Sequence, residues 1–211
     1  MTATTTRPIE LLSVPSRLQA TNHPPTINLR AAEEAVAALL VALGQPIVSE
    51  SLQETPRRVA SAFVEMLTPK EFDLTTFPNE EGYDELVLVR DIPFHSLCEH
   101  HLLPFKGVAH VGYLPGDRII GLSKLARVVE KFAARLQVQE RLTQQVADHL
   151  EEHLKPKGVG VVIEAEHMCM TLRGVQAAGT TTTTSAVHGL LRDDPRSRSE
   201  FFSLASRSHG C

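Results

Sequence analysis

The segment from His95 to His101 reads HSLCEHH and gathers one thiol, one carboxylate and three imidazoles into a short stretch of chain. Within it, Cys98 and His101 stand in a C-x-x-H spacing, which lets two side chains of one tight turn bind the same metal ion. His100 lies between them and is either a third ligand or a proton carrier. A histidine-rich surface loop would show the same letters, so a metal site requires a ligand from elsewhere in the chain.

Cys169 is the candidate for that further ligand. It lies in segment 159–173, whose alternation predicts a strand with Cys169, His167 and Arg173 on one face. A core cysteine beside an exposed histidine is the alternative interpretation. Two thiolates and one imidazole, from Cys98, Cys169 and His101, suit Zn²⁺. Three protein ligands leave the fourth position to water, as in a catalytic site, whereas a structural site would be closed by a fourth protein ligand. The number of candidate ligands does not decide between the two. The candidate fourth ligands are His100, His110 and His167.

A second group of polar residues indicates a bound phosphate. Lys124 and Arg127 are expected in the first turn of a helix capped by Ser123, where cations oppose the helix dipole unless an anion binds there. Ordinary solvated side chains would explain the same residues. Gln139 and Glu140 stand at the beginning of the next predicted helix. Together with the spare imidazoles, these groups suit a water-activating zinc enzyme that acts on a phosphorylated substrate.

Hydrophobic periodicity predicts the elements that position these residues. Helices are expected over 32–43, 55–67, 123–136 and 139–154; Thr55 would cap the second, and Leu136 would belong to the apolar stripe of the third. A short terminal helix should follow Asp194 and Pro195. Strands are expected over 86–90, 108–113, 118–120, 159–173 and 180–184, with a polar linker as the alternative for 180–184, while 70–85 is typical of a loop. After residue 85 the order is strand, strand, helix, helix, strand, strand, which predicts an α+β fold.

Composition narrows the class of protein. The 211 residues, 42% of them hydrophobic, are enough for one large domain or for a domain with an extension. A net charge of −4, with no Trp and 5% aromatic residues, argues against nucleic-acid binding through a broad basic face, and no apolar run is long enough to span a membrane. Three widely spaced cysteines predict a reducing, cytoplasmic location rather than a disulfide scaffold. Residues 1–28 predict a disordered leader, with an organellar transit peptide as the alternative.

Several long motifs resemble the GTP cyclohydrolase I family. They are HSLCEHHLLPF, GVAHVGYLPGDRIIGLSKLARVVEKFAARLQVQERLTQQ, GVVIEAEHMCMTLRGV and the TTTTTSA run, and the resemblance spans about residues 32–209, including LQETPRRVA. It implies the tunnelling fold for residues 85–209, in which an antiparallel sheet carries two helices on one side, preceded by a helical region over 29–84. It also implies pentameric barrels that stack into a homodecamer, with active sites between subunits.

The resemblance further implies the reaction. Zn²⁺ held by Cys98, His101 and Cys169 would activate water to attack C8 of the guanine of GTP, with His100 and His167 as proton carriers. Loss of C8 as formate, rearrangement of the ribose and ring closure would give 7,8-dihydroneopterin triphosphate. This is the first step of tetrahydrofolate and pterin biosynthesis.

The remaining site residues implied by the resemblance would hold the substrate. Glu140, with Gln139, would bind the N1 and 2-amino edge of the guanine, because a carboxylate offers a pair of acceptors. The triphosphate would be bound by Ser123, Lys124, Arg127, Arg173 and Arg58. Leu136 stands where the family usually has proline before QVQER, which would loosen the approach to the guanine pocket without removing a catalytic group.

Two other hypotheses compete with the cyclohydrolase. One is an oligomeric scaffold that is stabilised by zinc and binds nucleotide without chemistry. The other is a related tunnelling-fold enzyme acting on a pterin or a deazapurine. Glu140 does not separate these, since each must bind a purine-like or pterin-like edge, but the full set of Cys98, His101 and Cys169 favours the cyclohydrolase.

Overall fold

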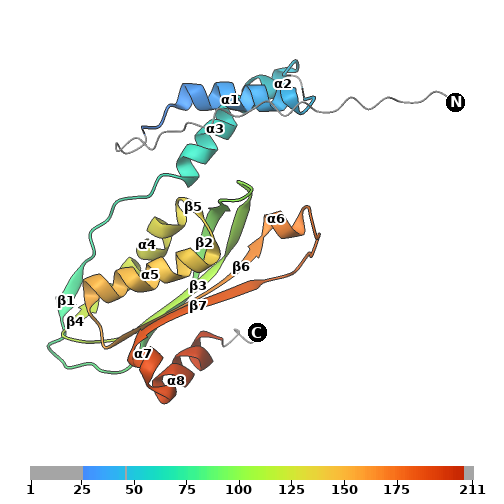
Figure 1. Ribbon diagram of the computed structural model, residues 1–211. Helices are drawn as coiled ribbons and strands as arrows, with labels where there is room; N and C mark the ends of the chain where they lie inside the picture. Colours follow the sequence, from blue (N-terminus) through green and yellow to red (C-terminus); the bar gives the residue numbers. More distant parts are fainter. Residues whose placement is uncertain (1–25, 46, 207–211) are drawn as a thin grey trace, which may run out of the picture.

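The computed structural model describes residues 26–45 and 47–206, so Cys211 and nearly all of the predicted leader over 1–28 lie outside the described residues. The first helices are α1 (Leu29–Ala42), α2 (Glu50–Gln53) and α3 (Thr55–Met66), and they form an arm that stands away from the rest of the chain (Figure 1). The residue in the N-cap position of α3 is Glu54 and not Thr55 as predicted. The carboxylate of Glu54 accepts a 2.6 Å hydrogen bond from Arg57 Nε one turn later.

The main domain is built on a five-stranded sheet in the order β5-β2-β3-β6-β7. Strands β2 (Val87–Cys98), β3 (Pro104–Leu114), β6 (Gly158–His167) and β7 (Thr182–Gly189) pair antiparallel, and the two-residue β5 (Leu136–Gln137) pairs parallel with β2. The predicted mixed α+β class is confirmed.

A second, two-stranded sheet corrects two of the sequence predictions. The segment predicted to be a loop over 70–85 contains β1 (Thr76–Pro78), and β4 (Arg118–Ile120) pairs with it instead of joining the main sheet. The side chain of Arg118 reinforces the pairing, because its Nε donates to Thr76 Oγ1 at 2.8 Å.

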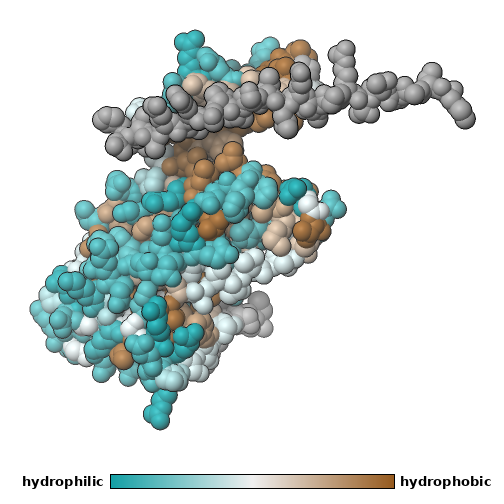
Figure 2. Space-filling view, in the orientation of Figure 1, coloured by the Kyte–Doolittle hydropathy of each residue, from teal (hydrophilic) through white to brown (hydrophobic). Residues whose placement is uncertain are grey.

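Helices cover both faces of the main sheet (Figure 1). On one face lie α4 (Leu122–Ala133) and α5 (Gln139–Leu154), whose apolar stripes are fully buried at Leu125, Val128, Leu142, Val146 and Leu150. On the other face lie α7 (Leu190–Asp193) and α8 (Pro195–Ala205), with Phe201 buried. Apolar residues gather on the helical arm and at its junction with the main domain (Figure 2). Among the described residues, no helix is both long and apolar enough to cross a membrane.

The boundaries of α4 differ from the prediction at both ends. Gly121 and not Ser123 is the N-cap residue, so Ser123 lies inside the first turn. The helix ends at Ala133, and Leu136 therefore belongs to β5 rather than to the helical stripe. At this end, the hydroxyl of Ser96 in β2 donates to Ala133 O at 2.7 Å and connects the last residue of the helix to the sheet.

The predicted strand over 159–173 is half right. Strand β6 ends at His167, which pairs with Phe105 of β3. The next residue would lie opposite Pro104, which has no backbone N–H to extend the ladder, and the chain turns into the short helix α6 (Met168–Thr171). The prediction that Cys169 and Arg173 share a strand face with His167 is therefore wrong.

Candidate metal centre

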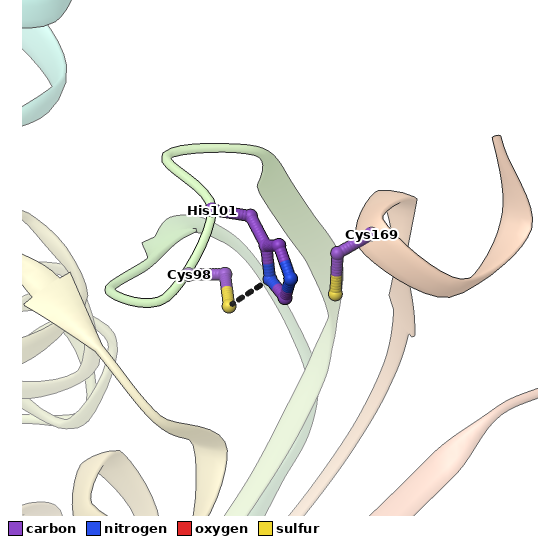
Figure 3. A group of neighbouring side chains, drawn as sticks. All are labelled: Cys98, His101 and Cys169. Atoms are coloured by element: carbon purple, nitrogen blue, oxygen red, sulfur yellow. Dashed lines mark hydrogen bonds between the residues drawn. The ribbon is translucent and has the colours of Figure 1, made fainter. Parts of the chain in front are cut away.

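The C-x-x-H segment forms a tight turn at the end of β2. The Cys98 N–H donates to Leu103 O at 2.9 Å, and the Leu102 N–H donates to Cys98 O at 2.9 Å. Leu102 adopts a positive φ of 56°, which lets the chain reverse into β3 within a few residues. The buried Cys98 is thereby fixed at the strand end, with His101 directed to the same point (Figure 3).

Cys169 reaches this point from α6. The donor atoms of Cys98, His101 and Cys169 all lie within 4.8 Å of one another, and Cys98 Sγ is 3.7 Å from His101 Nδ1 (Figure 3). In a tetrahedral zinc site, ligand bonds of about 2.3 Å for sulfur and 2.0 Å for nitrogen put these two atoms about 3.5 Å apart. Among the residues that the structure describes, this is the one group of three or more such side chains that could hold a metal ion.

The charge balance of the two thiols also favours a cation. Burial raises the pKa of the Cys169 thiol, and the adjacent Cys98 raises it further, whereas the nearby Arg173 guanidinium lowers it. Two neighbouring thiols therefore resist becoming two thiolates in the protein alone. A divalent metal ion between them reverses this preference, because its charge stabilises both thiolates.

Of the other candidate ligands, His100 lies next to this group and His110 lies away from it. His100 is exposed, with Nδ1 3.9 Å from Cys98 Sγ and Nε2 3.8 Å from Glu99 Oε1. His110 is only 4% exposed, and its Nδ1 accepts a 3.3 Å hydrogen bond from the Asp91 N–H where the register of β2 shifts. His110 therefore serves the sheet and does not join the metal group.

His167 is held beside the metal group by two partners of its own. Its ring stacks on Phe105 with centroids 4.6 Å apart and planes 5° apart, and its Nε2 lies 2.7 Å from Gln139 Oε1. Burial lowers the pKa of His167, and the exposed carboxylate of Glu140 opposes this more weakly. The beginning of α5 thus brings Gln139 and Glu140 to His167, as an acid–base site requires.

The predicted phosphate residues do not all lie together: the Arg173 guanidinium is near Cys169, whereas others line a separate cavity. Ser123 and Arg127 line a cavity of about 680 Å³ between the end of α3, β2 and α4, next to the Lys70–Glu130 ion pair of 2.8 Å. None of the three metal donors lines this cavity. Lys124 is in the first turn of α4, and Arg58 is in the arm, where its Nη2 donates to Ser51 O at 2.9 Å.

Sequence reasoning missed the residue that ties the metal turn to α5. A guanidinium nitrogen of Arg141 contacts the carboxylate of Glu99 inside the turn and also donates to Leu136 O at 3.0 Å. The Nε of Arg141 donates to Gln137 Oε1 at 2.9 Å, and the Glu99 N–H donates to Gln137 O at 3.0 Å. The sequence shows a carboxylate, Glu99, inside HSLCEHH and an arginine, Arg141, directly after Glu140. It does not show that they meet, because their contact depends on the pairing of β5 with β2.

The family model and the curated relatives point to the same family. A family model described as GTP cyclohydrolase I matches residues 32–206. A protein named GTP cyclohydrolase 1 from Aquifex aeolicus is 52% identical over 172 residues, which covers 82% of this chain and 94% of the relative. A protein of the same name from Corynebacterium glutamicum is 53% identical over 178 residues, which covers 82% of this chain and 91% of that relative. Among solved structures, the archaeosine synthase QueF-Like in the apo form is 16% identical, covers 49% of this chain and 93% of its own, and has a TM-score of 0.41.

Proposed function

The chain belongs to the GTP cyclohydrolase I family, and on that basis we propose that it converts GTP and water into 7,8-dihydroneopterin triphosphate and formate. Membership of this family assigns GTP cyclohydrolase activity to the chain. The observation that carries the finer proposal is the convergence of the Cys98, His101 and Cys169 donor atoms within 4.8 Å, beside two further histidines. The product would enter tetrahydrofolate and pterin synthesis.

Zn²⁺ is the metal that this donor set suits, because two thiolates and one imidazole are typical of its sites and leave one position open. When bound, the ion supplies Lewis-acid chemistry that activates water at neutral pH. The exposure of His101 supports an open site, since a closed structural site would shield its ligands.

The nearby side chains can carry the protons that opening of the imidazole ring requires. Addition of water to C8 releases a proton and delivers one to a ring nitrogen, so the reaction needs one group that accepts and one that donates. We assign these roles to His100, whose Nδ1 lies 3.9 Å from Cys98 Sγ, and to His167, which stands two residues before Cys169. The exposed carboxylate of Glu140 is proposed to accept hydrogen bonds from the guanine edge, and Arg173 to bind phosphate beyond α6.

The substrate would complete its contacts across a subunit boundary. Ser123, Lys124 and Arg127 are proposed to bind the triphosphate, yet the cavity that Ser123 and Arg127 line contains no metal donor. A site shared between subunits would reconcile these positions, and such sharing is compatible with the proposed tunnelling-fold decamer of two pentamers. Arg58, on the protruding arm, is proposed to contribute in the same way. A cytoplasmic location stays a prediction.

The direct test is turnover of GTP by the purified, zinc-loaded protein, with formate and the fluorescent pterin measured as separate products. Cys169→Ser should lose zinc and both products, while His153→Ala, an exposed histidine of α5 outside the site, should keep both. Removal of the metal with a chelator should abolish activity with the fold largely retained, since the core is apolar. Unfolding on chelation, without turnover by the loaded protein, would instead identify a nucleotide-binding scaffold.

A further inference from the structure

Gln139 begins α5, yet its side chain is 2% exposed and is enclosed by β6 and β7. Its Nε2 lies 2.9 Å from Ile163 O, 2.9 Å from Thr182 O and 3.1 Å from Thr184 Oγ1. Its Oε1 lies 2.7 Å from His167 Nε2. Both ends of this amide are therefore occupied by groups of the protein itself, which leaves the side chain no free position for a guanine.

The orientation of this amide follows from its neighbours. Ile163 O and Thr182 O are backbone carbonyl oxygens, which only accept hydrogen bonds, so the NH₂ end of Gln139 must face them. The opposite orientation would bring three oxygens together and leave buried groups unsatisfied. Gln139 Oε1 must then face His167, and as an acceptor it requires a hydrogen on His167 Nε2.

Two threonine hydroxyls complete the arrangement. Thr143 Oγ1 donates to Gln139 O at 2.8 Å, so its single hydrogen is used. Thr184 Oγ1, which lies 2.6 Å from Thr143 Oγ1, must therefore donate to it, and this leaves a lone pair of Thr184 to accept from Gln139 Nε2. The two hydrogens of Gln139 Nε2 point to Ile163 O and Thr182 O at 2.9 Å, and the longer contact to Thr184 Oγ1 at 3.1 Å shares one of them.

We propose that Gln139 is a positioning residue for His167, holding its Nε2 hydrogen so that Nδ1 is the atom through which a proton enters or leaves. The stacking of the ring on Phe105 fixes its plane, and the amide fixes its rotation within that plane. The result does not depend on the charge of His167, because Nε2 carries a hydrogen in either case. Within the described residues, Nδ1 of His167 has no hydrogen-bond partner and remains available.

The inference rests on the proposed function only in giving His167 a role in proton transfer. Gln139→Leu replaces the amide with an apolar side chain of similar size that cannot hold the ring, so kcat should fall about 10²-fold, with zinc content and the KM for GTP within about twofold. Gln144→Leu is the matched control, since it changes the same residue type at an exposed site on the same helix and should keep kcat.

A spectroscopic measurement separates positioning from stability. In the zinc-loaded oligomer labelled with ¹⁵N-histidine, the signal that disappears in His167→Ala should show a protonated Nε2 in the native protein and a mixture of tautomers in Gln139→Leu. A hydrogen on Nδ1 alone in the native protein would overturn the inference. An unchanged kcat in Gln139→Leu would also overturn it, as would a raised KM at constant kcat, which would mean that Gln139 binds GTP itself. If the native protein releases no formate, the proposed function is refuted, but the ¹⁵N measurement still tests whether Gln139 fixes the tautomer of His167.

Discussion

The three metal donors differ in exposure, and that difference bears on what the centre does. Cys98 is buried at the end of β2, Cys169 is partly buried on α6, and His101 is exposed. The group therefore opens to the surface on the side of the histidine. A structural centre is normally closed by a fourth protein ligand, whereas a reactive one must admit water and substrate. The exposure of His101 favours the reactive kind.

The role of His167 can be tested by removing its ring. We expect His167→Ala to bind zinc and GTP as the native protein does, because His167 is held by Gln139 and Phe105 and lies outside the group of donors. Turnover should fall by about 10² to 10⁴-fold, the usual contribution of a general acid or base. Single-turnover kinetics together with metal analysis would measure both. Loss of zinc from this variant would make His167 a ligand and refute the assignment.

At the scale of elements, the beginning of α5 holds both halves of the site. Gln139 contacts β6 and β7 next to the strand end that leads into Cys169, and Arg141, two residues later, holds the turn that carries His101. A small shift of this helix end would therefore move Cys98 and His101 relative to Cys169. Residues that orient metal ligands commonly affect metal affinity without touching the ion.

Arg141→Ala should therefore weaken zinc binding by about 10- to 100-fold, the usual effect of losing a group that orients a ligand. The turn would lose its contact between Arg141 and Glu99, while the hydrogen bond from the Glu99 N–H to Gln137 O would remain. Competition with a chromophoric chelator would measure the affinity. Arg57→Ala removes an exposed ion pair in the arm and should leave zinc binding unchanged, as a control. Equal zinc affinities in the two variants would mean that the contact between Arg141 and Glu99 does not orient the metal ligands.

Two glycines opposite each other on neighbouring strands make room for the terminal helix. Gly112 pairs with Gly160, and a Cβ at Gly160 would lie 2.6 Å from two ring carbons of Phe201, which is fully buried. Gly160→Ala should lower the free energy of unfolding by about 1–3 kcal/mol through overpacking. Adding Phe201→Leu should recover part of that loss, because the smaller side chain gives way. Chemical denaturation would measure both, and native stability in Gly160→Ala would mean that α8 docks elsewhere.

The sequence predicted those elements whose signal is local. The stripe through Leu142, Val146 and Leu150 lies on α5 as expected, because periodicity decides which face of a helix is buried. Cys169 lies next to Cys98 and His101 as predicted, but on helix α6 and not on a strand. The pairing of β6 with β3 ends before it, next to Pro104, which is distant in sequence. The two-residue β5 and the burial of Gln139 depend on contacts distant in sequence, which periodicity does not encode.

At the scale of the whole molecule, we propose that one chain holds only part of the site. The metal group lies where α4 ends, since Ser96 of β2, two residues before Cys98, binds Ala133 O at 2.7 Å. Ser123 lies ten residues earlier on α4, which is about 15 Å along the helix at the usual rise of about 1.5 Å per residue. We therefore propose that Ser123 and Arg127 of one chain serve the metal group of another.

Mixing two inactive variants tests whether the site is shared. Cys169→Ser removes the metal group and Arg127→Ala removes a proposed phosphate ligand, so each homo-oligomer should be nearly inactive. If each site takes its metal from one chain and its phosphate residues from another, random co-assembly in equal amounts leaves about a quarter of the sites intact. Formate release should then recover to about that fraction of the native rate after co-refolding. A mixture as inactive as its parents, with mixed oligomers verified by mass, would place both groups in the site of a single chain.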